Sequence, residues 1–209
     1  LIDNGCVISY ADLSGERGYK LEEDVVVDGM YYLLSDTLDL NGHTMTINGD
    51  FVQGGGSIII NGGSLIINGD YRVQTREENA VDADDGSGNT ETEIVYGESI
   101  GTLTMTNEED YIYIQGDYIN ESSIKQSNML TAGEMEIKGD VTVSMENIEA
   151  NFMPTGTHTI ILSGDTPQNI NLTFNSADTT KKYSCSNYYN SRNHFNNIEM
   201  NNTSIEGIN

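Results

Sequence analysis

The sequence predicts an all-β protein: a right-handed parallel β-helix of about seven coils, with three short strands per coil and a hairpin-like insertion. Three observations lead to this fold class. The chain repeats itself at a short interval, apolar residues alternate with polar ones, and no window has the apolar spacing of a helix. A repeat of this length that contains strands and no helix pattern is typical of a β-solenoid. An immunoglobulin-like sandwich would instead space its strands by about 8–12 residues without this self-similarity.

A glycine that follows a short apolar strand marks each repeat. The successive marker glycines lie 20, 20, 47, 23 and 25 residues apart, and the long interval corresponds to one coil plus an insertion. A sharp corner often requires positive φ, so we expect the marker glycines to adopt it and to stack above one another. These residues are Gly29, Gly49, Gly69, Gly116, Gly139 and Gly164.

Each coil is expected to hold three short strands separated by tight turns. Apolar residues alternate within them, as at Leu38 and Leu40, so that one face of each strand points inward. The second strand of a coil directly precedes the marker glycine. First strands are expected at 38–42, 58–62, 103–107 and 129–133, and third strands at 51–53, 71–74, 118–120 and 141–143. Successive coils would stack at the usual strand spacing of ~4.8 Å.

The repeat divides the chain into a cap and one solenoid domain. Residues 1–24 match the repeat poorly and are expected to cap the N-terminal end, because an open strand edge promotes aggregation. Residues 25–209 are expected to form a single β-helix domain. Within it, the acidic segment 77–98 is expected to be an insertion and the polar segment 175–194 a loop.

The composition limits the partners of the chain. It has 33 acidic and 9 basic side chains, and its formal net charge is −24. Such a surface repels nucleic-acid backbones and anionic membrane faces, so DNA, RNA and acidic lipid are poor candidates. No apolar run approaches the roughly 20 residues that span a bilayer, and we expect no membrane insertion. Cations, basic proteins and neutral polymers remain as partners.

An aspartate directly follows five of the marker glycines. In a β-helix these residues would share one register and form a vertical ladder of carboxylates, whose like charges repel. One interpretation is that each carboxylate accepts an N–H of its own turn, as in an Asx-turn. The alternative is a row of weak Ca²⁺ sites, since hard cations bind carboxylate and carbonyl oxygens. The ladder consists of Asp50, Asp70, Asp117, Asp140 and Asp165.

The insertion carries a second group of acids that resembles a calcium loop. No frame of this segment matches an EF-hand, which needs oxygen ligands at positions 1, 3 and 5, Gly at 6 and Glu at 12. The alternative is a solvated hairpin tip that serves as a contact loop. The candidate metal ligands are Asp82, Asp84, Asp85, Glu91 and Glu93. Calcium is the sole cofactor that the sequence suggests.

Aromatic residues recur at strand positions. Phe51, Tyr71 and Tyr118 share the position two residues after a marker glycine, and we expect them to stack on one another. An exposed row of tyrosines could instead bind sugar rings through their apolar faces. A candidate recognition patch lies in the polar segment near the C-terminus and consists of Tyr183, Tyr188, Tyr189, Arg192 and His194.

Several stretches of the chain resemble repeats of large secreted or surface proteins of Gram-positive bacteria. These stretches are GTLTMTN, the INGD-like turns, TGTHTIILSGDTPQNI and FNNIEMNN, and the resemblance covers about residues 10–205. The architecture is similar to that of filamentous-haemagglutinin-type adhesins. The resemblance implies an extracellular or cell-surface location, a place within a longer chain, and a protein or glycan on a cell surface as partner.

The leading hypothesis is a non-catalytic β-helix module, structural or adhesive, that acts as a rigid stalk and presents contact loops. The first alternative is a carbohydrate-binding module with an exposed aromatic row. A polysaccharide lyase or hydrolase is the second alternative, since such enzymes also use parallel β-helices. Against catalysis, His43, His158 and His194 are isolated in the sequence, and no nucleophile motif is present.

Overall fold

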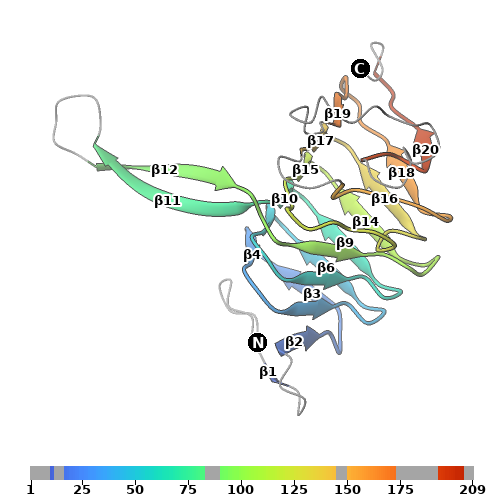
Figure 1. Ribbon diagram of the computed structural model, residues 1–209, viewed down its shortest axis with the longest axis horizontal. Coiled ribbons are helices and arrows are strands. Elements are labelled where there is room, and N and C mark those ends of the chain that lie inside the picture. Colours follow the sequence, from blue (N-terminus) through green and yellow to red (C-terminus); the bar gives the residue numbers. More distant parts are fainter. Residues whose placement is uncertain (1–9, 12–16, 83–89, 145–149, 173–192, 205–209) are drawn as a thin grey trace, which may run out of the picture.

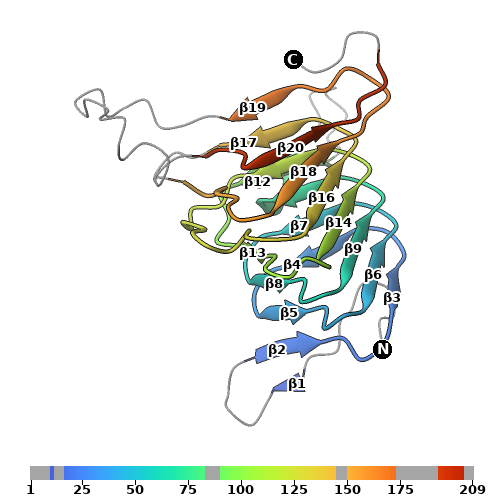
Figure 2. The same cartoon turned by 90° about the vertical axis from the view of Figure 1, so that its right-hand side faces the viewer.

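The structure, a computed structural model, describes residues 10–11, 17–82, 90–144, 150–172 and 193–204. Every regular element in these ranges is a β-strand, and the described part of the chain contains no helix. Three sheets run along the molecule, and neighbouring strands within each sheet come from successive coils (Figure 2). The predicted all-β parallel β-helix is therefore confirmed.

The three sheets form the walls of the solenoid. The seven-stranded sheet consists of β3 (Val25–Val27), β6 (Thr44–Ile47), β9 (Ser64–Ile67), β14 (Tyr111–Ile114), β16 (Glu134–Ile137), β18 (Thr159–Leu162) and β20 (Asn197–Met200). The six-stranded sheet consists of β4 (Tyr31–Leu33), β7 (Phe51–Gln53), β10 (Tyr71–Val73), β15 (Tyr118–Asn120), β17 (Val141–Val143) and β19 (Ile170–Leu172). The five-stranded sheet consists of β1 (Tyr10–Ala11), β2 (Arg17–Lys20), β5 (Thr37–Asp39), β8 (Ser57–Ile59) and β13 (Thr102–Thr104).

A constant register between coils brings like side chains together in the interior. In the seven-stranded sheet, Met45 pairs with Leu65, which in turn pairs with Ile112. Two positions further along the same strands, Ile47 pairs with Ile67. All five side chains are buried. Because burying an aliphatic side chain of this size contributes about 1.5–3 kcal/mol, this interior column is a major source of stability.

The described coils do not all contain three strands. The five-stranded sheet ends at β13, and the next coil contributes a single bridge between Met105 and Leu130 on that side. Buried side chains bind the backbone there instead. Gln126 Oε1 accepts the N–H of Leu103 at 3.1 Å, and Asn151 Nδ2 donates to the carbonyl oxygen of Ser122 at 2.8 Å. Since buried backbone groups need partners, these amides take over part of the role of the strand ladder.

Five of the six marker glycines are needed for a reason other than the predicted one. Only Gly29 has positive φ, at 91°, so the prediction of positive φ is wrong for the other five. A Cβ at Gly69 would lie 2.3 Å from Oδ1 of Asp50, and a Cβ at Gly116 would lie 2.2 Å from Oδ1 of Asp70. At Gly69, Gly116 and Gly139, glycine is required because the carboxylate of the preceding coil approaches too closely for a side chain, whereas at Gly49 and Gly164 the nearest atoms belong to the backbone of the preceding coil.

The solenoid begins earlier than its expected start at residue 25. Tyr19 of β2 pairs in parallel with Leu38 of β5, so the first coil starts inside the segment 1–24 that we expected to be a cap. β1 pairs antiparallel with β2 and covers the outer edge of that strand. A reversal of strand direction therefore protects this edge from further parallel pairing.

The insertion expected at 77–98 is an antiparallel ribbon of β11 (Thr75–Asp82) and β12 (Thr90–Gly97). Figure 1 shows the ribbon extending away from the stacked coils. Of the polar segment 175–194, the structure describes residues 193 and 194 alone.

The C-terminal edge of the seven-stranded sheet is formed by β20. Ile198 and Met200 pair with Ile160 and Leu162, and they occupy the interior column of the sheet. They are 43% and 64% exposed, whereas Ile160 and Leu162 are buried. The interior column therefore ends in apolar side chains that contact solvent.

Candidate functional site

The repeat aspartates form a ladder that joins successive coils, which we call the aspartate ladder. The backbone N–H of Asp70 donates to Oδ1 of Asp50 at 2.9 Å. The N–H of Asp117 donates to Oδ1 of Asp70, and that of Asp140 to Oδ1 of Asp117, both at 2.8 Å. Each carboxylate thus accepts a backbone N–H, but the donor belongs to the next coil and not to its own turn.

Asp165 does not belong to the aspartate ladder, contrary to the sequence prediction. β19 pairs with β17 so that Asn169 takes the ladder position, donating its N–H to Oδ1 of Asp140 at 2.8 Å and its Nδ2 to Oδ2 at 3.0 Å. The intervening residues form a loop in which the buried Gln168 accepts the N–H of Gly164 at 2.9 Å. This loop leaves Asp165 exposed to solvent.

The ladder carboxylates are already used by the protein itself. Their Oδ1 atoms accept backbone N–H groups, and Oδ2 of Asp70 binds Nη2 of Arg72 at 2.6 Å. These charge-assisted bonds offset the repulsion between stacked carboxylates. Within the described ranges, no group of three or more His, Cys, Asp or Glu side chains could hold a metal ion. The ladder is therefore a structural connection between coils.

The second group of predicted calcium ligands lies on and between the ribbon strands. Asp82 pairs with Thr90 at the last described position of β11, and Glu93 pairs with Asn79 and is exposed. Glu91 pairs with Val81. Asp84 and Asp85 lie outside the described residues. Calcium binding by this segment stays a prediction.

Most of the predicted recognition patch also falls outside the described residues. Tyr183, Tyr188, Tyr189 and Arg192 lie there, and His194 is the described member of the patch. The ring of His194 is half-buried, and its Nε2 lies 3.1 Å from a backbone carbonyl oxygen, that of Pro154. His194 therefore contacts the last coils.

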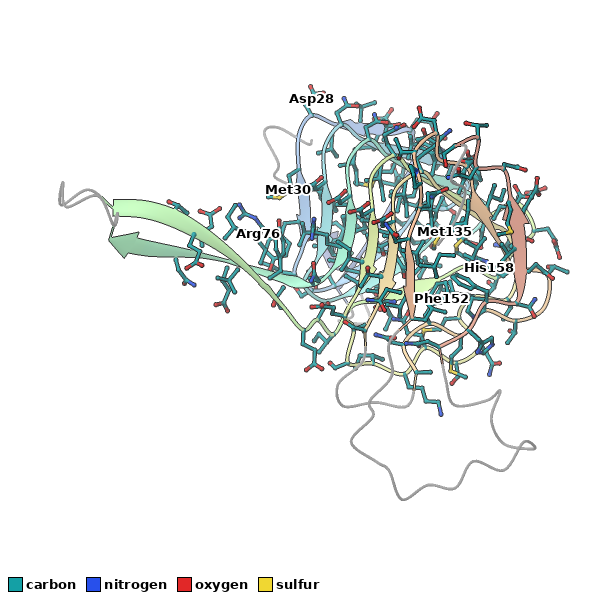
Figure 3. All side chains as sticks on the ribbon, turned by 90° about the horizontal axis from the view of Figure 1, so that it is seen from above. Asp28, Met30, Arg76, Met135, Phe152 and His158 are labelled. Atoms are coloured by element: carbon teal, nitrogen blue, oxygen red, sulfur yellow. The ribbon has the colours of Figure 1, made fainter. Side chains whose placement is uncertain are left out.

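Aromatic rings form a continuous stack inside the solenoid, which we call the aromatic stack. The predicted contacts between Phe51, Tyr71 and Tyr118 are confirmed, with ring centroids 4.8 Å and 5.5 Å apart. Tyr31 extends the stack at one end, and it also stands two residues after a marker glycine, a signal present in the sequence. Figure 3 shows Phe152 within the coil outline. The complete stack is Tyr31, Phe51, Tyr71, Tyr118, Phe152 and Phe195.

Buried tyrosine hydroxyls in the aromatic stack bind amide side chains of the same wall. The hydroxyl of Tyr71 donates to Oε1 of Gln53 at 2.7 Å, and Asn120 Nδ2 donates to the hydroxyl of Tyr118 at 3.0 Å. Burial raises the pKa of Tyr31 to about 12. With its rings covered and its hydroxyls satisfied, the stack serves packing and offers no surface to a sugar.

A buried acid and a buried histidine were not recognised in the sequence. The carboxylate of Asp110 accepts backbone N–H groups of Gly62, Thr106 and Asn107, which closes the corner of two coils. His158 is buried, and its Nδ1 lies 2.9 Å from the carbonyl oxygen of Ala132. Its Nε2 has no hydrogen-bond partner, and burial lowers its pKa. Both residues are buried and contact backbone groups of a neighbouring coil, which indicates structural roles.

A cluster at the root of the ribbon fixes it to the six-stranded sheet. The guanidinium of Arg72 lies 4.7 Å from the ring centre of Tyr96 while it also binds Asp70. The hydroxyl of Tyr32 accepts the N–H of Arg76 at 3.1 Å. Figure 3 shows Arg76 where the ribbon leaves the coils. Strands β4, β10, β11 and β12 contribute these residues, so the root is cross-linked by side chains from separate parts of the chain.

Comparison with protein-family models, curated proteins and solved structures finds no match to this chain. In the described ranges, the structure has no helix long and apolar enough to cross a membrane. The functional interpretation therefore depends on the geometry of the coils, the aspartate ladder and the ribbon.

Proposed function

We propose that this chain is a non-catalytic, rigid β-helix module of a bacterial cell-surface or secreted protein, and that it acts as a stalk presenting contact elements. The observation that carries the proposal is the unbroken seven-stranded sheet, in which every strand from β3 to β20 pairs in parallel with its neighbours. The resemblance of its repeats to those of bacterial surface proteins supports the proposed location.

Three columns of interactions make the module stiff along its axis. Backbone ladders join the coils in each wall, the aspartate ladder joins them at one corner, and the aromatic stack joins them in the interior. A force that separates two coils must break several of these contacts at once. A repeat protein with such nearest-neighbour interfaces resists extension coil by coil.

The two alternatives have less support. A carbohydrate-binding module needs exposed aromatic faces, and the aligned rings are buried here. A polysaccharide-active enzyme needs acids that converge beside its substrate, and the described carboxylates of the aspartate ladder bind backbone N–H groups of the next coil.

Single-molecule force spectroscopy on the full chain, pulled from its two ends, tests the stalk function. We expect discrete unfolding steps of about 7 nm, the contour length of one 20-residue coil at about 3.5 Å per residue. Ile114→Ala, which removes a buried side chain from the interior column, should lower the unfolding force. Ile66→Ala on the outer face of β9 is the matched control and should change it little. Smooth extension at low force, as for a flexible linker, would contradict the proposal.

A further inference from the structure

The ribbon is an unpartnered two-stranded sheet attached to a fully paired solenoid. Its eight residue pairs run from Thr75 and Gly97 to Asp82 and Thr90, and neither strand pairs with any other described strand. Each strand therefore has one free edge of N–H and C=O groups. A two-stranded ribbon has no core of its own and is marginally stable in water, so such an element usually packs against something.

The root of the ribbon is fixed, while its outer part is free. Arg72, Tyr32 and Tyr96 hold the end nearest the coils. Beyond this root, Figure 1 shows no contact between the ribbon and the solenoid. The arrangement holds a strand edge in a defined direction away from the body, which suits recognition of a partner.

The exposed surface of the ribbon combines apolar side chains with dense negative charge. Ile94 and Val95 are 47% and 40% exposed, and as neighbours in a strand they point to opposite faces. Glu77 pairs with Val95, and Glu93 lies two positions along β12 on the same face. Strands β11 and β12 contain five acidic residues and one basic residue. The basic one, Arg76, already binds Glu78.

We propose that the ribbon is a docking arm that binds an extended, basic segment of another protein, which adds as a third strand to a free edge. The backbone ladder would supply affinity, Ile94 or Val95 would contact apolar side chains, and the carboxylates would select lysine or arginine at alternate positions. A second copy of this chain would bring its own net charge of −24 and be repelled. The inference rests on the proposed function, because it names the partner class of a contact element on the stalk.

Binding of defined peptides to the full chain tests the proposal. The probe is an eight-residue peptide of alternating Lys and Val, which is strand-forming and cationic. A Lys–Pro peptide of equal charge is the control for strand addition, because proline has no N–H to donate to the ladder. We expect the Lys–Val peptide to bind at least about tenfold more tightly than the Lys–Pro peptide in isothermal titration calorimetry at low salt. Hydrogen exchange should show that the peptide protects amides of β11 or β12 and not those of the coils.

Paired neutral variants locate the site. Glu77→Gln with Glu93→Gln removes two charges from one face of the ribbon and should weaken Lys–Val binding by about fivefold or more. Glu22→Gln with Glu23→Gln removes two exposed charges from a loop of the first coil and should leave binding within about twofold. The thermal unfolding midpoint of each variant is measured first, and only variants with the wild-type midpoint are compared, so that a folding defect is not read as lost binding.

Three outcomes would overturn the docking arm. Equal binding of the two peptides would mean general charge attraction without strand addition. Equal loss of binding in both variant pairs would mean that net charge alone attracts the peptide. Self-association of the unliganded protein that the ribbon variant abolishes would make a second copy the occupant. None of these outcomes changes the unfolding force of the solenoid, so the stalk function and the docking arm fail separately.

Discussion

At the corner beside the aspartate ladder, glycine is required by contact with the coil before it. A Cβ at Gly116 would lie 2.2 Å from Oδ1 of Asp70 and 2.9 Å from the backbone of Gly69, and the backbone cannot move without disturbing the ladder. This requirement differs from that of the Asn61–Gly62 corner, where φ is 50° and 77° and open space surrounds the glycine. The two kinds of glycine look alike in sequence, yet one provides conformational freedom and the other provides room.

Gly116→Ala tests whether this corner excludes a side chain for steric reasons. The added methyl group overpacks the contact with Asp70, and we expect a loss of about 1–3 kcal/mol in the free energy of unfolding, measured by urea titration. Gly18→Ala is the control, since its Cβ would meet its nearest neighbour at an ordinary 3.5 Å. Equal effects of the two substitutions would mean that the loss comes from backbone propensity and not from the ladder contact.

His158 makes the stability of the protein depend on pH. Burial lowers its pKa in the folded state below the usual 6.5. Nε2 has no hydrogen-bond partner, so a proton added there would find no acceptor. Below pH 6.5 the unfolded chain binds this proton while the folded protein does not. Stability is therefore lost as the pH falls from 6.5 toward the lowered pKa, by up to about 1.4 kcal/mol per pH unit.

Urea unfolding of His158→Gln between pH 7 and pH 5 checks this dependence. We expect the wild type to lose stability more steeply than the variant, which has no imidazole to titrate. His43→Gln, which leaves the buried His158 in place, is the matched control. The same pH dependence in wild type and His158→Gln would exclude His158 as its source.

At the scale of single elements, side chains take over where strand pairing ends. The aspartate ladder joins coils at the corner between the seven-stranded and six-stranded sheets, where each Asp lies between two strands. At the last rung, Asn169 donates both its N–H and its Nδ2 to Asp140. The aspartates of the ladder act as acceptors through Oδ1, and the side-chain amide of Asn also has such an oxygen, so we expect the acceptor to matter more at these positions than the negative charge.

Two substitutions at Asp117 separate the acceptor from the charge. Asp117→Asn retains an oxygen for the N–H of Asp140 and removes one of the repelling charges, so its stability should stay within about 1 kcal/mol of wild type. Asp117→Ala leaves that N–H without its partner and should cost about 1–3 kcal/mol. Thermal and urea unfolding of both variants would show this order, and equal loss in both would make the charge itself essential.

The elements also show what the sequence could and could not predict. Alternating residues such as Leu65 and Ile67 specify the strands and their buried face, because period-2 burial is local information. The ladder position of Asn169 was missed, since a matching Gly–Asp pair occurs four residues earlier and the loop that displaces it has no local signature. Phe152 was missed for a similar reason: it enters the aromatic stack from an irregular segment.

At the scale of the whole molecule, a rigid interior is combined with a strongly acidic surface. The net charge of −24 destabilises the compact state through self-repulsion, while the coils hold stacked carboxylates close together. Only a few described acids have basic partners, such as Asp70 with Arg72 and Asp39 with Lys20. Screening by salt should therefore stabilise the folded protein.

Thermal unfolding in NaCl from about 10 mM to about 300 mM tests this expectation, because the Debye length shortens from roughly 30 Å to well below 10 Å over that range. We expect the unfolding midpoint to rise steadily with salt. It should rise less in the double variant Glu77→Lys with Glu93→Lys, whose net charge is less negative than the −24 of the wild type. A falling midpoint would mean that ion pairs dominate over repulsion.

CaCl₂ at matched ionic strength distinguishes screening from binding, since a ligand that binds only the folded state adds its own stabilisation. Equal rises in both salts would indicate screening alone, and a larger rise in CaCl₂ would mean that calcium binds the folded protein, at the acidic segment from Asp82 to Glu93 or at the aspartate ladder.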